Sequence, residues 1–133
     1  MTVANVLVVD DEAGVRTNLR RMLANLGHEA WDAADGAEAL RLLDGIRFDM
    51  VIADVYMAEM DGMELLVRIQ HRGLKIPVVM ISGGGYLASE EVLAMGKACG
   101  AVATLDKPFT PKQLRKTIEP LLKPPPQQRV RGE

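Results

Sequence analysis

Two adjacent acids, Asp10 and Asp11, follow four branched aliphatic residues in the stretch VLVVDDEAGVR. An apolar run of this kind predicts a buried strand, which would deliver two like charges to one point. Neighbouring carboxylates repel, and removal from water favours their protonated forms. A positive charge is therefore expected beside them.

Three more reactive side chains occupy matching places: Asp54 ends the run MVIAD, Ser82 ends IPVVMIS, and Lys107 comes shortly after AVATL. Taken singly, each has a plain structural explanation, because Asp caps helices, Ser starts turns and Lys is usually solvated. Taken together, they place acids, a hydroxyl and an amine at the carboxyl ends of strands, where an open α/β sheet binds ligands. Such an acidic oxygen site suits Mg²⁺, which would answer the need for positive charge.

The elements that must position these residues alternate along the chain. Short apolar runs predict buried strands, and stretches with apolar residues three or four apart predict helices between them. The predicted strands cover 5–9, 28–34, 50–54, 76–82 and 101–105, and the apolar faces of the predicted helices fall within 15–26, 37–43, 63–69, 87–95 and 114–122. In the third of these helices the predicted inner face is Met63, Leu66, Val67 and Ile69. Five strand-helix units predict a doubly wound α/β domain with a five-stranded parallel sheet and five helices.

Length and composition narrow the class of protein. The 133 residues suit one domain, expected over 1–122, with the proline-rich stretch 123–133 as a flexible tail. The formal net charge of −2, from scattered charges of both signs, gives no reason to expect a nucleic acid or an anionic membrane as partner. Cys99 is the only cysteine, which excludes an internal disulfide. With neither a signal peptide nor a membrane-spanning run, the expectation is a soluble, cytoplasmic protein.

These motifs resemble those of the receiver domains of two-component response regulators over nearly the whole chain, from 3 to 122. The segment VVDDE resembles the acidic pair of that family, and DMVIADVYMAEMDGMELL its phosphoacceptor strand and the loop after it. PVVMISG resembles the strand that carries a hydroxyl, and LDKPF the turn of lysine and proline. The resemblance implies a flavodoxin-like sheet with strand order 2-1-3-4-5.

The resemblance also implies a function. Asp54 would accept a phosphoryl group from the phosphohistidine of a histidine kinase or a histidine phosphotransfer protein. Mg²⁺ would be held by Asp11, Asp54 and the backbone carbonyl of Tyr56, and by Asp10 through water. Because phosphoryl transfer passes through a loose transition state, positioning and charge neutralisation are the main tasks of such a site.

The same resemblance implies roles for two further residues and the conformation of one peptide bond. Lys107 would neutralise charge on the phosphoryl group, and Ser82 would donate a hydrogen bond to one of its oxygens. The peptide bond between Lys107 and Pro108 is expected to be cis, which proline permits at low cost.

Part of the family pattern is missing. Thr104 stands where receivers commonly carry a tyrosine or phenylalanine that swings inward when the hydroxyl moves. Glycines follow Ser82 where one small residue is usual, and glycine lowers the order of a loop. We therefore expect the switch to act through Ser82, Gly83 and Gly84 rather than through Thr104.

The sequence thus predicts a stand-alone receiver that is no enzyme beyond its own phosphorylation from small phosphodonors and its dephosphorylation. It would dock on an unknown downstream effector protein, without nucleic acid or membrane, as a monomer or weak homodimer. One alternative is a pseudo-receiver adaptor that works without phosphorylation, although no acid and no lysine of the set is missing. Another is an aspartate-nucleophile phosphohydrolase, which requires a second aspartate two residues after its first-strand nucleophile. Glu12 occupies that place instead, so the spacing DDEAG disfavours the hydrolase.

Overall fold

The structure, a computed structural model, describes residues 3–83, 94, 98, 101 and 103–122. Its strands are β1 (Asn5–Val9), β2 (Glu29–Ala33), β3 (Met50–Asp54), β4 (Val78–Ser82) and β5 (Ala103–Asp106), and its helices are α1 (Ala13–Asn25), α2 (Gly36–Gly45), α3 (Gly62–His71) and α5 (Pro111–Leu122). The helix predicted around 87–95, the residue Gly84 and the proline-rich stretch 123–133 lie outside the described residues.

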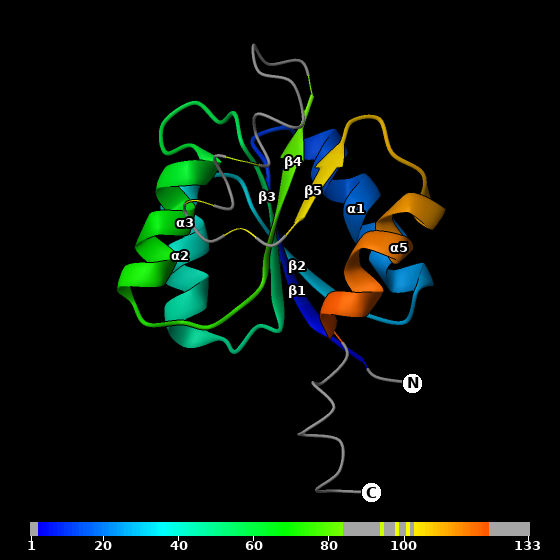
Figure 1. Cartoon of the computed structure of the whole chain (residues 1–133), viewed down its shortest axis with the longest axis horizontal. Helices are drawn as coiled ribbons and strands as arrows, with labels where there is room; N and C mark the ends of the chain where they lie inside the picture. The colour runs from blue at the N-terminus through cyan, green and yellow to red at the C-terminus, as the bar shows by residue number, and fades with distance from the viewer. Residues whose placement is uncertain (1–2, 84–93, 95–97, 99–100, 102, 123–133) are drawn as a thin grey trace, which may run out of the picture.

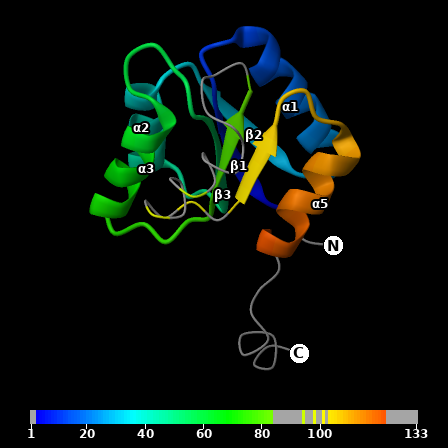
Figure 2. The same ribbon diagram turned by 45° about the horizontal axis from the view of Figure 1, so that its top comes forward.

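The strands form one parallel sheet in the order β2-β1-β3-β4-β5. Helices α2 and α3 cover one face of the sheet, and α1 and α5 cover the other (Figures 1 and 2). This arrangement confirms the predicted doubly wound α/β fold and the strand order 2-1-3-4-5.

Burial along the strands follows their place in the sheet. Every residue of β3 and β4 is buried, because these strands have neighbours on both edges and helices on both faces. The edge strand β2 has alternating exposed and half-buried positions and a buried last residue, as expected of a strand with a neighbour on one edge only. Three predicted strands, 28–34, 76–82 and 101–105, were placed with errors of one or two residues at their ends, and β5 extends to Asp106.

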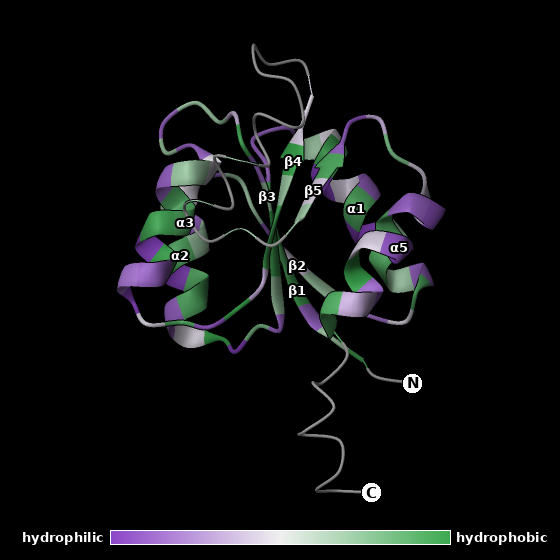
Figure 3. Ribbon diagram, viewed as in Figure 1, coloured by the Kyte–Doolittle hydropathy of each residue, from purple (hydrophilic) through white to green (hydrophobic). Residues whose placement is uncertain are grey.

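The core has two halves, one on each face of the sheet. Consecutive strand residues point to opposite faces, so Leu7 packs toward α2 and α3 while Val8 packs toward α1 and α5. Figure 3 shows apolar residues along β3 and β4 and most of the polar residues on helices and loops. One predicted face was partly wrong: in α3, Leu65 is buried, whereas Val67 is 36% exposed.

Local signals account for the helix ends. The side chains of Asp35 and Asp61 accept hydrogen bonds from the backbone N–H three residues later, at 2.8 and 2.9 Å, and so cap α2 and α3. Gly27 follows α1 with φ of 90°, a conformation that glycine adopts without a steric penalty. Within the described ranges, no helix is both long and apolar enough to cross a bilayer.

Candidate functional site

The reactive side chains converge at the carboxyl edge of the sheet. Asp10 directly follows β1, Asp54 and Ser82 are the last residues of β3 and β4, and Lys107 directly follows β5. The parallel register aligns these strand ends, since Asp54 lies beside Ile81 and Ser82 beside Asp106. The fold therefore brings together four residues that are far apart in the sequence.

Lys107 lies at the centre of this group. Its Nζ is 3.0 Å from Oδ2 of Asp54, 3.2 Å from Oδ2 of Asp10 and 3.3 Å from Oε1 of Glu12. The positive charge required by the acidic pair is thus present within the chain itself. The sequence analysis had suggested a metal ion for this role, because the sequence alone does not give the distance in space between Asp10 and Lys107.

Asp10 is completely buried. Its Oδ1 accepts a hydrogen bond from the backbone N–H of Glu12 at 2.9 Å, and its backbone carbonyl accepts one from Nη1 of Arg16 at 2.7 Å. Its Oδ2 makes the ion pair with Lys107 but has no hydrogen bond of good geometry in the described part of the chain. A buried carboxylate oxygen with this little compensation can accept a further cationic partner.

Asp54 is 4% exposed and held at both oxygens. Oδ1 accepts a hydrogen bond from the backbone N–H of Tyr56 at 3.1 Å, and Oδ2 accepts one from Lys107. Burial raises the pKa of the Asp54 carboxyl above its usual range, and repulsion from Asp10 adds to this, while the hydrogen bonds from Lys107 and Tyr56 oppose it. Burial also disfavours the charge on Lys107, but its hydrogen bond to Asp54 and its attraction to both aspartates raise the pKa of the ammonium overall.

Four acids surround one point: Asp10, Asp11, Glu12 and Asp54 can each offer one oxygen, and these oxygens all lie within 4.8 Å of one another. Asp10 and Asp54 are buried, whereas Asp11 and Glu12 are exposed. Lys107 pairs with Asp10, Glu12 and Asp54, so these three carboxylates and the nearby Asp11 outnumber the one ammonium that the described residues place against them. This set of hard oxygen ligands, with the undercompensated Oδ2 of Asp10, fits a hydrated Mg²⁺ ion.

Glu12 also belongs to this site, although it was not among the site residues predicted from the sequence. It is the N-cap residue of α1, but its side chain makes no capping hydrogen bond and instead reaches Lys107. The available signal was its place next to Asp10 and Asp11, at the start of a helix. A helix N-terminus favours an acid for its own sake, so that signal alone did not distinguish a site residue from a capping residue.

Ser82 is 3% exposed, and its Oγ donates a hydrogen bond to Oδ1 of Asp106 at 2.8 Å. Its backbone carbonyl accepts one from the N–H of Lys107 at 2.7 Å. Next to it, Gly83 has φ of 153°, and a Cβ there would lie 2.8 Å from Cβ of Lys107. The position requires glycine because the lysine backbone passes so close.

The remaining predicted residues lie near this edge. The peptide bond between Lys107 and Pro108 is cis. Thr104 is half-buried in β5, beside Met80 of β4. Tyr56 is half-buried against the core half that packs under α2 and α3.

Gly62, at the start of α3, allows this helix to pack closely against the backbone of the site. Its N–H donates a hydrogen bond to the carbonyl of Val55 at 3.0 Å. A Cβ at this position would collide with the backbone carbonyl of Asp54 and would lie 2.8 Å from Cε of Met80. The close approach of α3 to the phosphoacceptor candidate therefore depends on the missing side chain.

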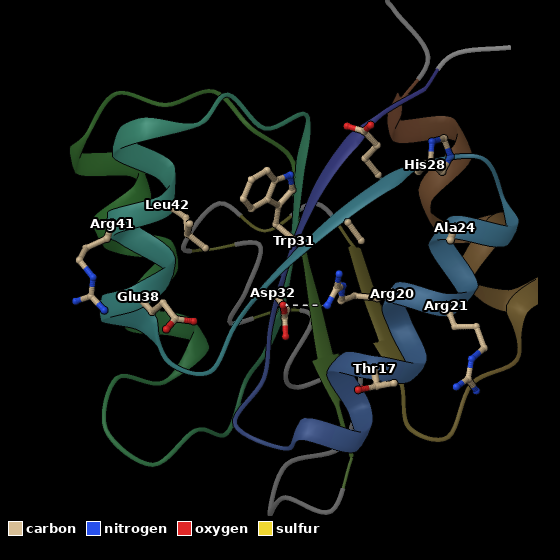
Figure 4. A pocket seen from close by; sticks show the side chains of 12 residues that line it. Thr17, Arg20, Arg21, Ala24, His28, Trp31, Asp32, Glu38, Arg41 and Leu42 are labelled. Atoms are coloured by element: carbon tan, nitrogen blue, oxygen red, sulfur yellow. Dashed lines mark hydrogen bonds and ion pairs between the residues drawn. The ribbon is translucent and has the colours of Figure 1, made fainter.

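A surface groove lies elsewhere, along β2 between α1 and α2 (Figure 4). Trp31, 44% exposed, meets Phe48 edge-on with ring centroids 6.4 Å apart. Asp32 pairs with Arg16 at 3.0 Å and with Arg20 at 3.5 Å. The groove contains none of the four clustered acids, but Arg16, which pairs with Asp32, also donates the hydrogen bond to the backbone carbonyl of Asp10.

Comparison with known proteins gives the family. The sequence model of the response regulator receiver domain matches residues 6–119. The response regulator MprA of Mycobacterium sp. (strain KMS) is 36% identical over 118 residues, which are 89% of this chain and 50% of that protein. The alkaline phosphatase synthesis transcriptional regulatory protein PhoP of Bacillus subtilis (strain 168) is 29% identical over 120 residues, 89% of this chain and 48% of that protein. The chain thus spans about half the length of these relatives.

Solved structures agree in fold and in sequence. The chemotaxis protein CheY4 of Vibrio cholerae superposes with a TM-score of 0.81 at 38% identity, covering 91% of this chain and 100% of that one. NtrX of Brucella abortus gives a TM-score of 0.83 at 32% identity, covering 91% of this chain and 27% of that one. Together with the match over 6–119, these similarities show that the chain belongs to the response regulator receiver domain family.

Proposed function

We propose that this receiver domain is a phosphorylation-dependent switch in which Asp54 accepts a phosphoryl group from phosphohistidine. The donor would be a histidine kinase or a histidine phosphotransfer protein. The observation that carries this proposal is the placement of Asp54, nearly buried, 3.0 Å from Lys107 and within the cluster of Asp10, Asp11 and Glu12. A nucleophilic carboxylate beside a fixed cation is the arrangement that an acyl phosphate requires.

The chain's own residues prepare Asp54 for attack. Tyr56 N–H and Lys107 each bind one carboxylate oxygen, so the side chain is oriented at both ends. These bonds favour the ionised form against the effect of burial. In the transfer, a carboxylate oxygen attacks phosphorus, the P–N bond to the imidazole breaks, and the electron pair remains on the imidazole nitrogen. Lys107 then stabilises the charge on the phosphoryl oxygens.

Asp11, Asp54 and the backbone carbonyl of Tyr56 would hold Mg²⁺ directly, and Asp10 would act through water, with Glu12 at the margin of the site. The bound ion would supply further neutralising charge to the phosphoryl oxygens. The fit rests on the four acidic oxygens within 4.8 Å of one another and on the undercompensated Oδ2 of Asp10.

Ser82 would donate a hydrogen bond to a phosphoryl oxygen, and the changed region around it would be read by a downstream effector protein. A cytoplasmic location and a monomeric or weakly dimeric state belong to the same proposal. So does the absence of a nucleic-acid partner, although several relatives are named as transcriptional regulators. The proposal that the switch acts through Gly83 and Gly84 rather than through Thr104 rests on the lack of an aromatic side chain at position 104.

The test is intact-mass spectrometry of the chain after incubation with acetyl phosphate, with and without Mg²⁺. We expect a labile gain of one phosphoryl group that needs Mg²⁺ and is lost in Asp54→Asn. The matched control is Asp44→Asn, which removes an exposed acid paired with Arg72 on the surface and should leave the gain intact. No gain would favour the adaptor without phosphorylation, and steady release of phosphate from varied substrates would favour the phosphohydrolase.

A further inference from the structure

The hydroxyl of Ser82 already has an acceptor within the chain. Oγ of Ser82 donates to Oδ1 of Asp106 at 2.8 Å, and the two residues are register partners at the ends of β4 and β5. The backbone bond from Lys107 N–H to the Ser82 carbonyl, 2.7 Å, holds the two strand ends together. Asp106 immediately precedes the lysine of the site, but neither the proposed transfer nor the proposed cation site uses it.

A serine hydroxyl has one proton to donate. If Asp54 carries a phosphoryl group, a phosphoryl oxygen needs the same proton that Asp106 now accepts. We propose that Asp106 is a positioning residue that holds the Ser82 hydroxyl in the unphosphorylated chain and competes with the phosphoryl group for it. This inference rests on the proposed function, because it needs a phosphoryl group on Asp54.

The difference in burial between Ser82 and Asp106 makes this competition effective. Ser82 is 3% exposed, so water cannot readily replace a lost acceptor and the hydroxyl must bind one acceptor or the other. Asp106 is exposed, so its carboxylate can be hydrated after the hydroxyl leaves. Loss of the Ser82 hydroxyl therefore costs Asp106 little free energy. In the unphosphorylated chain, the hydrogen bond from Ser82 to the charged carboxylate of Asp106 is still stabilising.

The exchange gives the domain two discrete arrangements that phosphorylation can bias. The proton of Ser82 moves from one acceptor to the other by rotation of the side chain, and the pairing of β4 with β5 stays in place. Strand β5 thereby takes part in the switch through its last residue, Asp106, rather than through Thr104. A residue at position 106 without an acceptor oxygen, such as alanine, would remove the competition and favour the phosphorylated arrangement.

The experiment measures the affinity of the full chain for beryllofluoride, a mimic of the phosphoryl group, in the presence of Mg²⁺. In Asp106→Ala we expect binding about tenfold tighter than in the wild type, the effect of one charge-assisted hydrogen bond. Asp106→Asn, which keeps an acceptor oxygen, should show a smaller gain. Glu119→Gln removes another exposed negative charge, on α5, and should leave the affinity unchanged.

A second pair of variants separates positioning from general charge effects. In a Ser82→Ala background the change Asp106→Ala should alter the affinity by less than about twofold, since the proton under competition is gone. An equal gain in both backgrounds would overturn the inference and assign the effect to charge alone. Unchanged or weaker binding in Asp106→Ala would also overturn it. If the wild type still binds beryllofluoride in that case, the proposed function is unaffected. Failure of the wild type to bind the mimic would overturn both proposals.

A double-mutant cycle on stability checks the contact without any phosphodonor. Ser82→Ala and Asp106→Ala should show a coupling in urea denaturation without Mg²⁺, and this coupling should vanish when beryllofluoride is saturating. A coupling that persists with the mimic bound would mean that the hydroxyl never leaves Asp106, which contradicts the competition.

Discussion

Replacing Lys107 by methionine should strongly destabilise the domain in metal-free buffer. The change removes the only ammonium that the described residues place against Asp10, which is completely buried, and Asp54, which is 4% exposed. Breaking a buried ion pair by removing one partner typically costs about 3–5 kcal/mol. Because the Lys107 side chain is 20% exposed and water can reach it, we expect the lower end, about 3 kcal/mol. For a domain of this size that corresponds to a fall in Tm of roughly 10 °C.

The loss should depend on pH with a definite sign. The pKa of Asp54 in the folded chain is already raised by burial, and the hydrogen bond from Lys107 opposes that rise. Without Lys107 the folded-state pKa rises further above the unfolded value, so the folded state binds more protons than the unfolded state. Stability then falls as pH rises through this window. The deficit of Lys107→Met should be largest near neutral pH and should shrink toward about pH 5.

The assay is urea denaturation followed by circular dichroism at both pH values. The control is Lys116→Met, which removes an exposed lysine from α5 and should change stability by less than about 0.5 kcal/mol. A deficit below about 1 kcal/mol for Lys107→Met, or one that is the same at both pH values, would refute the view that this lysine compensates buried carboxylates.

Three further predictions concern the same edge of the sheet. Asp54→Asn should raise the free energy of unfolding near neutral pH in metal-free buffer and leave it unchanged in acid, because the raised pKa shows that the folded environment disfavours this charge; urea denaturation at the two pH values tests this. Gly62→Ala should cost about 2 kcal/mol by the same measurement because its Cβ meets the Asp54 carbonyl, whereas Gly45→Ala, with open space around the new Cβ, should cost nothing. Asp11→Ala should change metal-free stability by less than about 0.5 kcal/mol, since the residue is exposed, yet should abolish Mg²⁺-dependent phosphorylation in a mass assay.

Much of the fold could be predicted because it depends on local patterns. Buried strands and amphipathic helices leave different periodicities, and polar residues at strand ends mark where the sheet stops. Strand ends were less certain, both in the edge strand β2 and in the interior strand β4, because an apolar residue can continue a strand pattern beyond the last ladder pair. The exposed Val67 and the buried Leu65 of α3 show a further limit: an apolar residue next to the inner face of a helix can fall on either side of its boundary.

The convergence of Asp10, Asp54 and Lys107 at one edge of the sheet was predictable, because each of them lies at the end of an apolar strand pattern. The partners of these residues were not, because they depend on contacts between distant parts of the chain. Glu12 reaches Lys107 across 95 residues, and Ser82 reaches Asp106 across 24. Each of these acids also has an ordinary explanation as a capping or surface residue, so only the register of the sheet reveals its neighbours.

The proposed role of Asp54 is tested most directly by locating the phosphoryl group on the chain. After reaction with acetyl phosphate and Mg²⁺, borohydride reduces an aspartyl phosphate to homoserine, and peptide mass spectrometry then identifies the converted residue. We expect homoserine at position 54 alone, with no conversion when Mg²⁺ is chelated. Conversion at Asp10, Asp11 or another acid, with Asp54 unchanged, would contradict it.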